Sequence, residues 1–263
     1  MPTRSKITNF FAFVALVAIS ITIISCQPDD KPEPKYGKLI IKVANQVNGV
    51  DAVLNEMKYA NKAANDYGIT RIQYYLSNFQ LSSTDCEDFI PENDYHLISL
   101  FQDPNIGDPS NDFIYQKDTF ELKIPAGCYD ELTFGMGVDP ERNKEGPYDG
   151  DLDFSWNMNW SWSGDYIFFK NEGYYKSTTG DTNNFIFHIG DNSFYQTVNF
   201  AFDKTLDIAE NETVTITLIA DLNEFFANPN TIDLNKRSTT MSPGTLADSI
   251  RTNYFNMFSI EMP

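Results

Sequence analysis

Lys38-Leu39-Ile40-Ile41-Lys42-Val43 and Arg71-Ile72-Gln73-Tyr74-Tyr75-Leu76 are the two stretches that indicate the fold class most directly. Both have the two-residue period or the β-branched and aromatic content of strands. Further segments of this kind lie at 96–100, 120–124, 132–136, 166–170, 185–189, 197–202, 214–219 and 258–262. Helical pattern is confined to short pieces at 222–226 and 245–255. The pattern predicts an all-β protein, a β-sandwich of the immunoglobulin-like or Greek-key type with short helices near the C-terminus.

The N-terminus has the features of an export signal. Arg4 and Lys6 precede an apolar run at 10–24, which ends in Ser25-Cys26. A small residue directly before a cysteine resembles the lipobox of bacterial lipoproteins, in which the thiol is acylated and the chain is cut so that cysteine comes first. The alternative is a transmembrane anchor, but the run is shorter than the roughly 20 residues that a spanning helix needs.

Three regions follow from this interpretation. We expect a signal peptide at 1–25, a lipidated Cys26 with a flexible, proline-rich tether at 26–36, and one β-sandwich domain at 37–263. Gln27 followed by Asp29-Asp30 resembles the sorting signals of Bacteroidota lipoproteins. The protein is therefore expected to be an outer-membrane lipoprotein, on the periplasmic face or the cell surface, that contacts membrane lipid through Cys26.

Charge and cysteine content narrow the function classes. The chain has 37 acidic and 19 basic residues and a net charge of −18, so its surface repels phosphate backbones and no nucleic-acid partner is expected. Once Cys26 is assigned to the lipid, Cys86 and Cys128 remain, an even number in an oxidising compartment. A disulfide between them is expected. The alternative, two separate buried thiols, stays open because sequence cannot show that the two residues are close.

All three tryptophans lie in one segment, residues 154–166. As a strand, this segment would place Trp156, Trp160 and Trp162 on one side. Such a cluster has two interpretations of about equal weight: a ladder that covers the open end of the sandwich, or a binding site.

Several motifs carry a resemblance to a known family. They are Met158-Asn159-Trp160-Ser161-Trp162, then Tyr166-Ile167-Phe168-Phe169-Lys170-Asn171-Glu172-Gly173, then Phe187-His188-Ile189-Gly190, and their order and spacing both match. In these features the chain resembles the MbnP family of bacterial envelope proteins, which includes the CorA- and MopE-type copper-binding proteins. The resemblance covers nearly the whole exported domain.

The resemblance implies a copper site. Relatives in methane-oxidising bacteria bind copper through histidines and a tryptophan that a dihaem peroxidase-like (MbnH-type) maturation enzyme oxidises to kynurenine. By analogy, His188 and His96 are the candidate metal ligands, and Trp160 or Trp162 is the candidate for oxidation. Imidazole suits copper, and oxidised tryptophan offers an amine donor. The chain has only these two histidines.

Other interpretations of the same residues remain open. His188 could instead be a structural histidine that hydrogen-bonds a backbone carbonyl or Glu172. Acidic loops at 103–108, 139–143 and 149–153 could bind calcium, although none completes an EF-hand pattern and solvated turns are the simpler account. Enzyme signatures are absent, so no catalysis is expected. The runner-up function is a surface module that binds glycans or proteins through the aromatic segment.

Overall fold

The computed structural model describes residues 35–91, 94–102, 114–144 and 146–263, and these residues belong to one compact unit. Its strands are β1 Tyr36–Val47, β2 Val50–Asp51, β3 Tyr59–Ala60, β4 Asp66–Ser82, β5 Tyr95–Gln102, β6 Ile114–Lys117, β7 Thr119–Pro125, β8 Gly127–Met136, β9 Phe169–Lys176, β10 Thr182–Ile189, β11 Gln196–Ile208, β12 Thr213–Asp221, β13 Thr239–Thr240 and β14 Phe258–Glu261. Cys26, the acidic loop at 103–108 and the expected signal and tether up to residue 34 lie outside the described residues.

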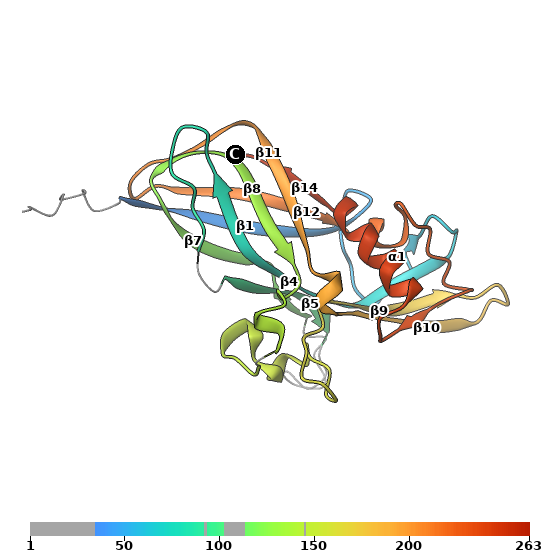
Figure 1. The fold of residues 1–263 in the computed structure, drawn as a ribbon. Helices are drawn as coiled ribbons and strands as arrows, with labels where there is room; N and C mark the ends of the chain where they lie inside the picture. The colour runs from blue at the N-terminus through green and yellow to red at the C-terminus, as the bar shows by residue number, and fades with distance from the viewer. Residues whose placement is uncertain (1–34, 92–93, 103–113, 145) are drawn as a thin grey trace, which may run out of the picture. The chain divides into compact units, whose positions relative to one another are not determined.

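The strands form two sheets, which confirms the predicted all-β sandwich (Figure 1). The smaller sheet has five strands in the order β14-β12-β1-β2, with β7 also paired to β1. The larger has nine strands, with β11-β8-β4-β9-β10-β13 as its main path and β3, β5 and β6 added through β4. The alternation in β1 explains the layering, because Leu39, Ile41 and Val43 are all at most 1% exposed and their neighbours point outward.

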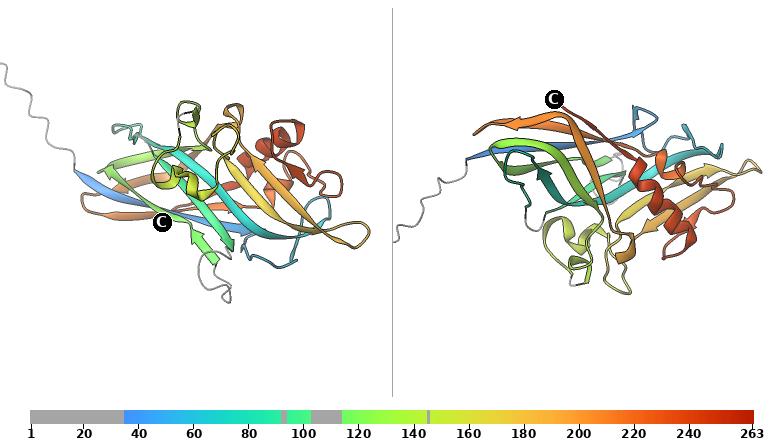
Figure 2. Two further views of the ribbon diagram at one scale, coloured as in Figure 1. Left: turned by 90° about the horizontal axis from the view of Figure 1, so that it is seen from below. Right: turned by 45° about the horizontal axis from the view of Figure 1, so that its top comes forward.

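Strand β4 organises the larger sheet and is drawn in cyan in Figures 1 and 2. Its residues 67–74 pair with β9, its residues 76–82 pair with β8, and its residues 71–77 pair with β5. A break in register between Ser77 and Gln80 contains Asn78, whose φ is 51°. This bulge bends the strand where its neighbour changes from β9 to β8. Both faces of β4 are buried, so a further layer covers the outer face of the sheet.

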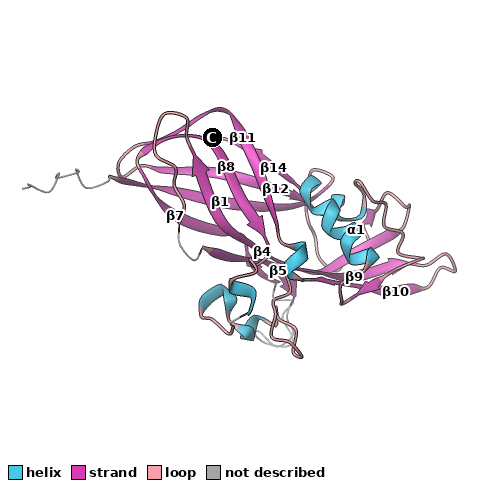
Figure 3. Cartoon of the chain, viewed as in Figure 1, coloured by secondary structure: helices cyan, strands magenta, loops and turns pink. Residues whose placement is uncertain are grey.

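The helices are short and lie outside the two sheets (Figure 3). The 3-10 helix η5 spans Glu224–Phe226, and the helix α1, Thr245–Asn253, continues into η6, Tyr254–Asn256. They confirm the helical pieces expected at 222–226 and 245–255. Phe225 and Tyr254 pack on Phe169 with ring centroids 5.1 and 5.2 Å apart, which closes this end of the core. No helix in the described part of the chain is long and apolar enough to cross a membrane.

The outer layer of the larger sheet is the segment 139–168, which we call the covering segment. It contains the 3-10 helices η1 Arg142–Lys144, η2 Gly150–Leu152 and η3 Phe154–Trp156, in yellow-green in Figure 1. The hydroxyl of Tyr75 on β4 donates to the carbonyl of Asp151 at 3.0 Å, which attaches the segment to the sheet. The expected strand at 166–170 begins only at Phe169.

Candidate metal site

His188 lies on β10, beneath the covering segment, and is 9% exposed. The β9–β10 register places Lys170 directly opposite it, with Glu172 one diagonal step away on the same face. The ring Nε2 of His188 is 2.6 Å from Oε1 of Glu172. Among the described residues Glu172 is the one hydrogen-bond partner of this ring, and it is one of the two partners expected for a structural histidine at this position.

The pairing determines what the imidazole can do. Burial raises the pKa of the Glu172 carboxyl, but the hydrogen bond from His188 and the positive charges of His188, Arg71 and Lys170 outweigh burial and hold that pKa below its usual range. An ionised carboxylate only accepts hydrogen bonds, so Nε2 carries the proton and donates it. In the neutral imidazole this leaves a lone pair on Nδ1, the arrangement in which carboxylate-oriented histidines bind metal ions.

One cation contacts the Glu172 carboxylate and a second lies near it. Arg71 Nε lies 3.5 Å from Oε2, and Arg71 also stacks its guanidinium 4.1 Å from the ring centroid of Phe101. Lys170 is only 7% exposed, and its Nζ donates to the carbonyl of Asn157 in the covering segment at 2.6 Å. Burial lowers the pKa of Lys170 to about 8. The covering segment buries Lys170, whereas the side chains of Arg71 and Glu172 keep 25% and 29% of their surface exposed.

The burial of Lys170 predicts a pH dependence of stability. Its pKa is about 8 in the folded protein and 10.5 as a free side chain. Below the folded pKa the lysine is charged in both states, so the cost of burying the charge is fully present. Between these values only the unfolded chain holds the proton, so the free energy of unfolding rises with pH. Denaturant unfolding of wild type and Lys170→Met should show the variant's relative stability falling by about 3 kcal/mol between about pH 7 and about pH 11. A difference independent of pH would contradict the burial of a charged amine.

The tryptophan segment is not a strand, and the expectation that alternation aligns its three indoles is wrong. Trp156 ends η3, and Asn157 then takes a left-handed conformation with φ 55°. A tight turn follows, in which the Gly164 N–H donates to the Trp160 carbonyl at 2.8 Å with a φ of +80° at the glycine. Trp156 precedes this turn and lies apart from the other two tryptophans. Its indole N–H donates to the Gly150 carbonyl at 3.0 Å.

Trp160 and Trp162 stay together beside the histidine. Their rings stack with centroids 4.9 Å apart, and the ring of Trp160 lies 6.2 Å from that of His188. Trp160 is 6% exposed, whereas Trp162 is 69% exposed. Although the sequence has no histidine next to the tryptophans, the fold therefore brings one to Trp160. A cavity of about 200 Å³ opens along both indoles and is also lined by Met241 and by Asp191, which follows β10.

The second candidate ligand, His96, is not brought to this site. On β5, Ser99 pairs with Gln73, which pairs with Lys170, which pairs with His188, so these residues share one face of the sheet. His96 is three positions before Ser99 and therefore points to the opposite face. The two histidines are also separated by three strand spacings of about 4.8 Å each.

His96 instead packs in the space between the sheets. Its ring stacks on Phe120 of β7, in the smaller sheet, at a centroid distance of 3.6 Å. Its Nε2 lies 2.6 Å from Oδ1 of Asp94, whose other oxygen accepts the Phe79 N–H at 3.1 Å. These contacts are those of a structural histidine with its own buried carboxylate.

Cys86 and Cys128 lie side by side, with their Sγ atoms 2.6 Å apart as free thiols. Cys86 is exposed and Cys128 partly exposed, so the alternative of two separate buried thiols is wrong. The hydrogen bond to Cys128 lowers the pKa of the Cys86 thiol, which favours the thiolate that attacks during oxidation.

The juxtaposed thiols predict that a disulfide forms at this position in an oxidising compartment. Denatured without reductant, protein purified from such a compartment should show no thiol reactive toward an alkylating reagent at either cysteine. After reduction both should react, and peptide mapping should locate them. Full alkylation without reductant would contradict the pairing.

In each of the two described acidic loops, one carboxylate forms several interactions within the protein: Asp139 in the first and Asp151 in the second. Asp139 accepts hydrogen bonds from the backbone N–H groups of Glu141 and Arg142, and from the side chains of Asn78 and Tyr95. Asp151 accepts the Leu97 N–H at 2.8 Å and an ion pair from Lys117. Within the described residues no group of three or more His, Cys, Asp or Glu side chains could hold a metal ion. The carboxylates of Asp139 and Asp151 thus serve a turn and an attachment.

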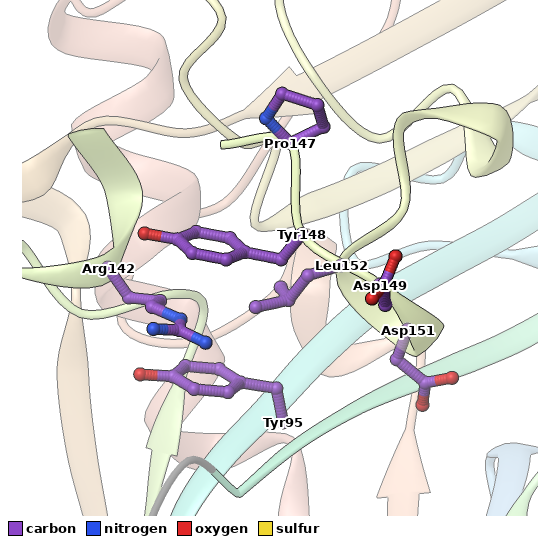
Figure 4. A pocket seen from close by; sticks show the side chains of 7 residues that line it. All are labelled: Tyr95, Arg142, Pro147, Tyr148, Asp149, Asp151 and Leu152. Carbon is purple, nitrogen blue, oxygen red and sulfur yellow. The ribbon is translucent and has the colours of Figure 1, made fainter. Parts of the chain in front are cut away.

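A second cavity, of about 380 Å³, lies at the other end of the covering segment (Figure 4). Arg142 is inserted between two aromatic rings there, with its guanidinium carbon 3.7 Å from the centroid of Tyr148 and 6.0 Å from that of Tyr95. The carboxylates of Asp149 and Asp151 lie across the cavity in Figure 4. Sequence reasoning missed this arrangement because only the fold brings Tyr95 of β5 to Arg142 and Tyr148.

Sequence reasoning also missed Lys170 and Arg71 as parts of the His188 surroundings. One signal was available: Lys170 and Glu172 are spaced by two within an otherwise apolar and aromatic strand, so they share a face. Two opposite charges on one face of a largely buried strand indicate that a further part of the chain packs over that face. No signal in the sequence gave the register that adds Arg71.

Comparisons with known proteins agree with this architecture. A family model described as MbnP matches residues 36–242. Among solved structures, the chain is similar to MbnP from Methylosinus trichosporium, with a TM-score of 0.55 and 14% sequence identity over 87% of this chain and 99% of that one. At this identity the likeness concerns the fold alone. No curated protein sequence matches the chain.

Proposed function

Because the chain belongs to the MbnP family, we propose that it is an accessory protein of the cell envelope that binds copper at His188 beside Trp160 and catalyses no reaction itself. The observation that carries the proposal is the position of His188 between two residues. Its Nε2 lies 2.6 Å from Oε1 of Glu172, and its ring centroid lies 6.2 Å from that of Trp160. The carboxylate orients the imidazole, and Nδ1 is left as the ligand atom.

The donor set fits copper better than it fits a hard cation. One neutral imidazole without a cluster of carboxylates offers little to calcium, which needs six to eight oxygen ligands. Copper in its reduced state accepts few ligands and prefers nitrogen and sulfur. Trp160 is the tryptophan whose oxidation to kynurenine would add an amine donor, because it lies next to His188, whereas Trp162 lies on the outer side of the stack.

The remaining parts of the proposal concern location and maturation. A lipid on Cys26 would hold the domain at the outer membrane, on the periplasmic face or the cell surface, behind a flexible tether. A dihaem peroxidase-like enzyme of the envelope would oxidise the tryptophan. The exposed ring of Trp162, stacked on Trp160, is the part of this pair that such a partner can reach.

Mass mapping of protein from its native host tests the proposal. The peptide that contains Trp160 should carry the mass of a kynurenine, and the purified protein should hold copper that chelators remove slowly. Protein made without the maturation partner serves as the control and should carry an unmodified indole. Native protein with three unmodified tryptophans and no bound or bindable copper would contradict the metal function.

A second function, recognition of a glycan or a surface protein, is favoured by one observation. Trp162 exposes 69% of its surface, and such a ring can stack on a sugar face. Under this alternative, neutral oligosaccharides should bind and quench the tryptophan fluorescence, and Trp162→Ala should abolish this binding. Copper should bind no more tightly than it does to any acidic protein. Unchanged fluorescence with every oligosaccharide would exclude the glycan version.

A further inference from the structure

Met241 follows the short strand β13, which runs parallel to β10 at the edge of the larger sheet. Ile186 pairs with Thr239 and Phe187 pairs with Thr240. One further step along both chains sets Met241 beside His188. Neighbours in a parallel pair point to the same face, so the methionine and the imidazole share the face that the covering segment closes.

The cavity beside the tryptophans places Met241 independently. Its walls include Trp160, Trp162 and Met241 within a volume of about 200 Å³. The same wall carries Gly190 and Asp191, which follow His188, so the chain after β13 runs alongside the end of β10. Strand register, continued one step past Thr240, thus places Met241 beside His188, and the cavity places it beside Trp160, whose ring centroid lies 6.2 Å from that of His188.

The exposure of Met241 argues against a packing role. It is 41% exposed, although methionine usually fills gaps inside cores. Two carboxylates, Asp165 and Asp191, also line this cavity. One oxygen of Asp191 accepts two hydrogen bonds from Ser193, through the backbone N–H at 2.8 Å and the hydroxyl. The thioether is the accessible soft donor on this wall.

We infer that Met241 Sδ is a copper ligand that acts together with His188 Nδ1, at the open side of the Trp160 ring. The inference rests on the proposed function and adds a specificity to it. A thioether combined with an imidazole selects Cu(I), because soft sulfur binds the reduced ion well and binds calcium or magnesium poorly. With the second histidine of the chain on the opposite face of the sheet, methionine takes the place of a further nitrogen donor.

Competition between the mature protein and a chromogenic Cu(I) chelator, without oxygen, tests the inference. Met241→Leu keeps the size and apolar character of the side chain and should weaken Cu(I) binding by about 10-fold or more. Met262→Leu, at the end of β14 in the smaller sheet, is the matched control and should bind as the wild type does. X-ray absorption at the copper edge should show a sulfur neighbour in the wild type and in Met262→Leu, and none in Met241→Leu.

The outcomes distinguish failure of the Met241 inference from failure of the proposed copper function. If His188→Ala loses Cu(I) while Met241→Leu matches the wild type in affinity and retains the sulfur signal, the methionine inference is overturned and the proposed function stands. If the wild type from its native host binds no Cu(I), both are overturned. Equal loss in Met241→Leu and Met262→Leu would show a general effect on folding and would also overturn the role of Met241.

Discussion

Replacing Gly173 by alanine should lower the free energy of unfolding by more than about 3 kcal/mol, the upper end of what overpacking costs. The Cβ would stand 2.1 Å from the carbonyl oxygen of Gly68 on β4 and 2.6 Å from the ring of Phe185 on β10. A flexible side chain could yield, but the carbonyl belongs to the backbone of the central strand. Relief would require β4 and β9 to separate, and their hydrogen-bonded ladder spans residues 67–74 of β4.

The matched control for this change is Gly244→Ala. No heavy atom lies within 4 Å of the Cβ that this substitution would add. Gly244 is the N-cap of α1, where alanine is less favourable than glycine, so the unfolding free energy should fall by no more than about 1 kcal/mol. Chemical denaturation of the three proteins, followed by tryptophan fluorescence, gives the comparison. Equal stability of Gly173→Ala and Gly244→Ala would mean that the close approach of β4 and β9 is wrong.

Replacing His188 by alanine should weaken Cu(I) binding by at least about 100-fold. Loss of an outer-shell partner of a ligand already costs 10–100-fold in metal affinity, and loss of the ligand itself costs more. The fold should survive, because the Glu172 carboxylate keeps its contact with Arg71. Competition against a Cu(I) chelator, with circular dichroism to verify folding, measures the effect.

His96→Ala is the control for this change, because it should affect stability and not Cu(I) binding. Its ring packs between the sheets, 3.6 Å from the Phe120 centroid, and takes no part in the face that carries His188. The substitution should lower the unfolding temperature, because a partly buried stack is lost, and leave Cu(I) affinity unchanged. If both histidine variants lost copper equally, the assignment of the two imidazoles to different faces would be contradicted.

Much of the fold follows from local signals that the sequence contains. β1 shows why: its alternation of Leu39, Ile41 and Val43 with outward residues is set by the chain itself and survives in the sandwich. The helical pieces near the C-terminus were predictable for the same reason, since Ile250 and Tyr254 fall on one buried face. Local periodicity is sufficient wherever one face of an element meets the core.

The site was less predictable because it depends on tertiary structure. The tryptophan segment has the composition of a strand, yet Asn157 and Gly164 take positive φ values and turn it into a loop. Asparagine and glycine are the residues that tolerate this conformation, so the signal was present but outweighed by the aromatic content. Which histidine meets Trp160 depends on the register between β4 and β9, two strands that are far apart in sequence. No local pattern encodes that register.

The position of the bound copper ion decides whether His188 is its ligand. Crystals of the copper-loaded mature protein, measured on both sides of the copper absorption edge, give an anomalous difference map that marks the ion. We expect one strong peak within bonding distance of His188 Nδ1, next to the ring of Trp160. A peak at His96, at the Cys86 and Cys128 pair or in the acidic loops, with none at His188, would contradict it.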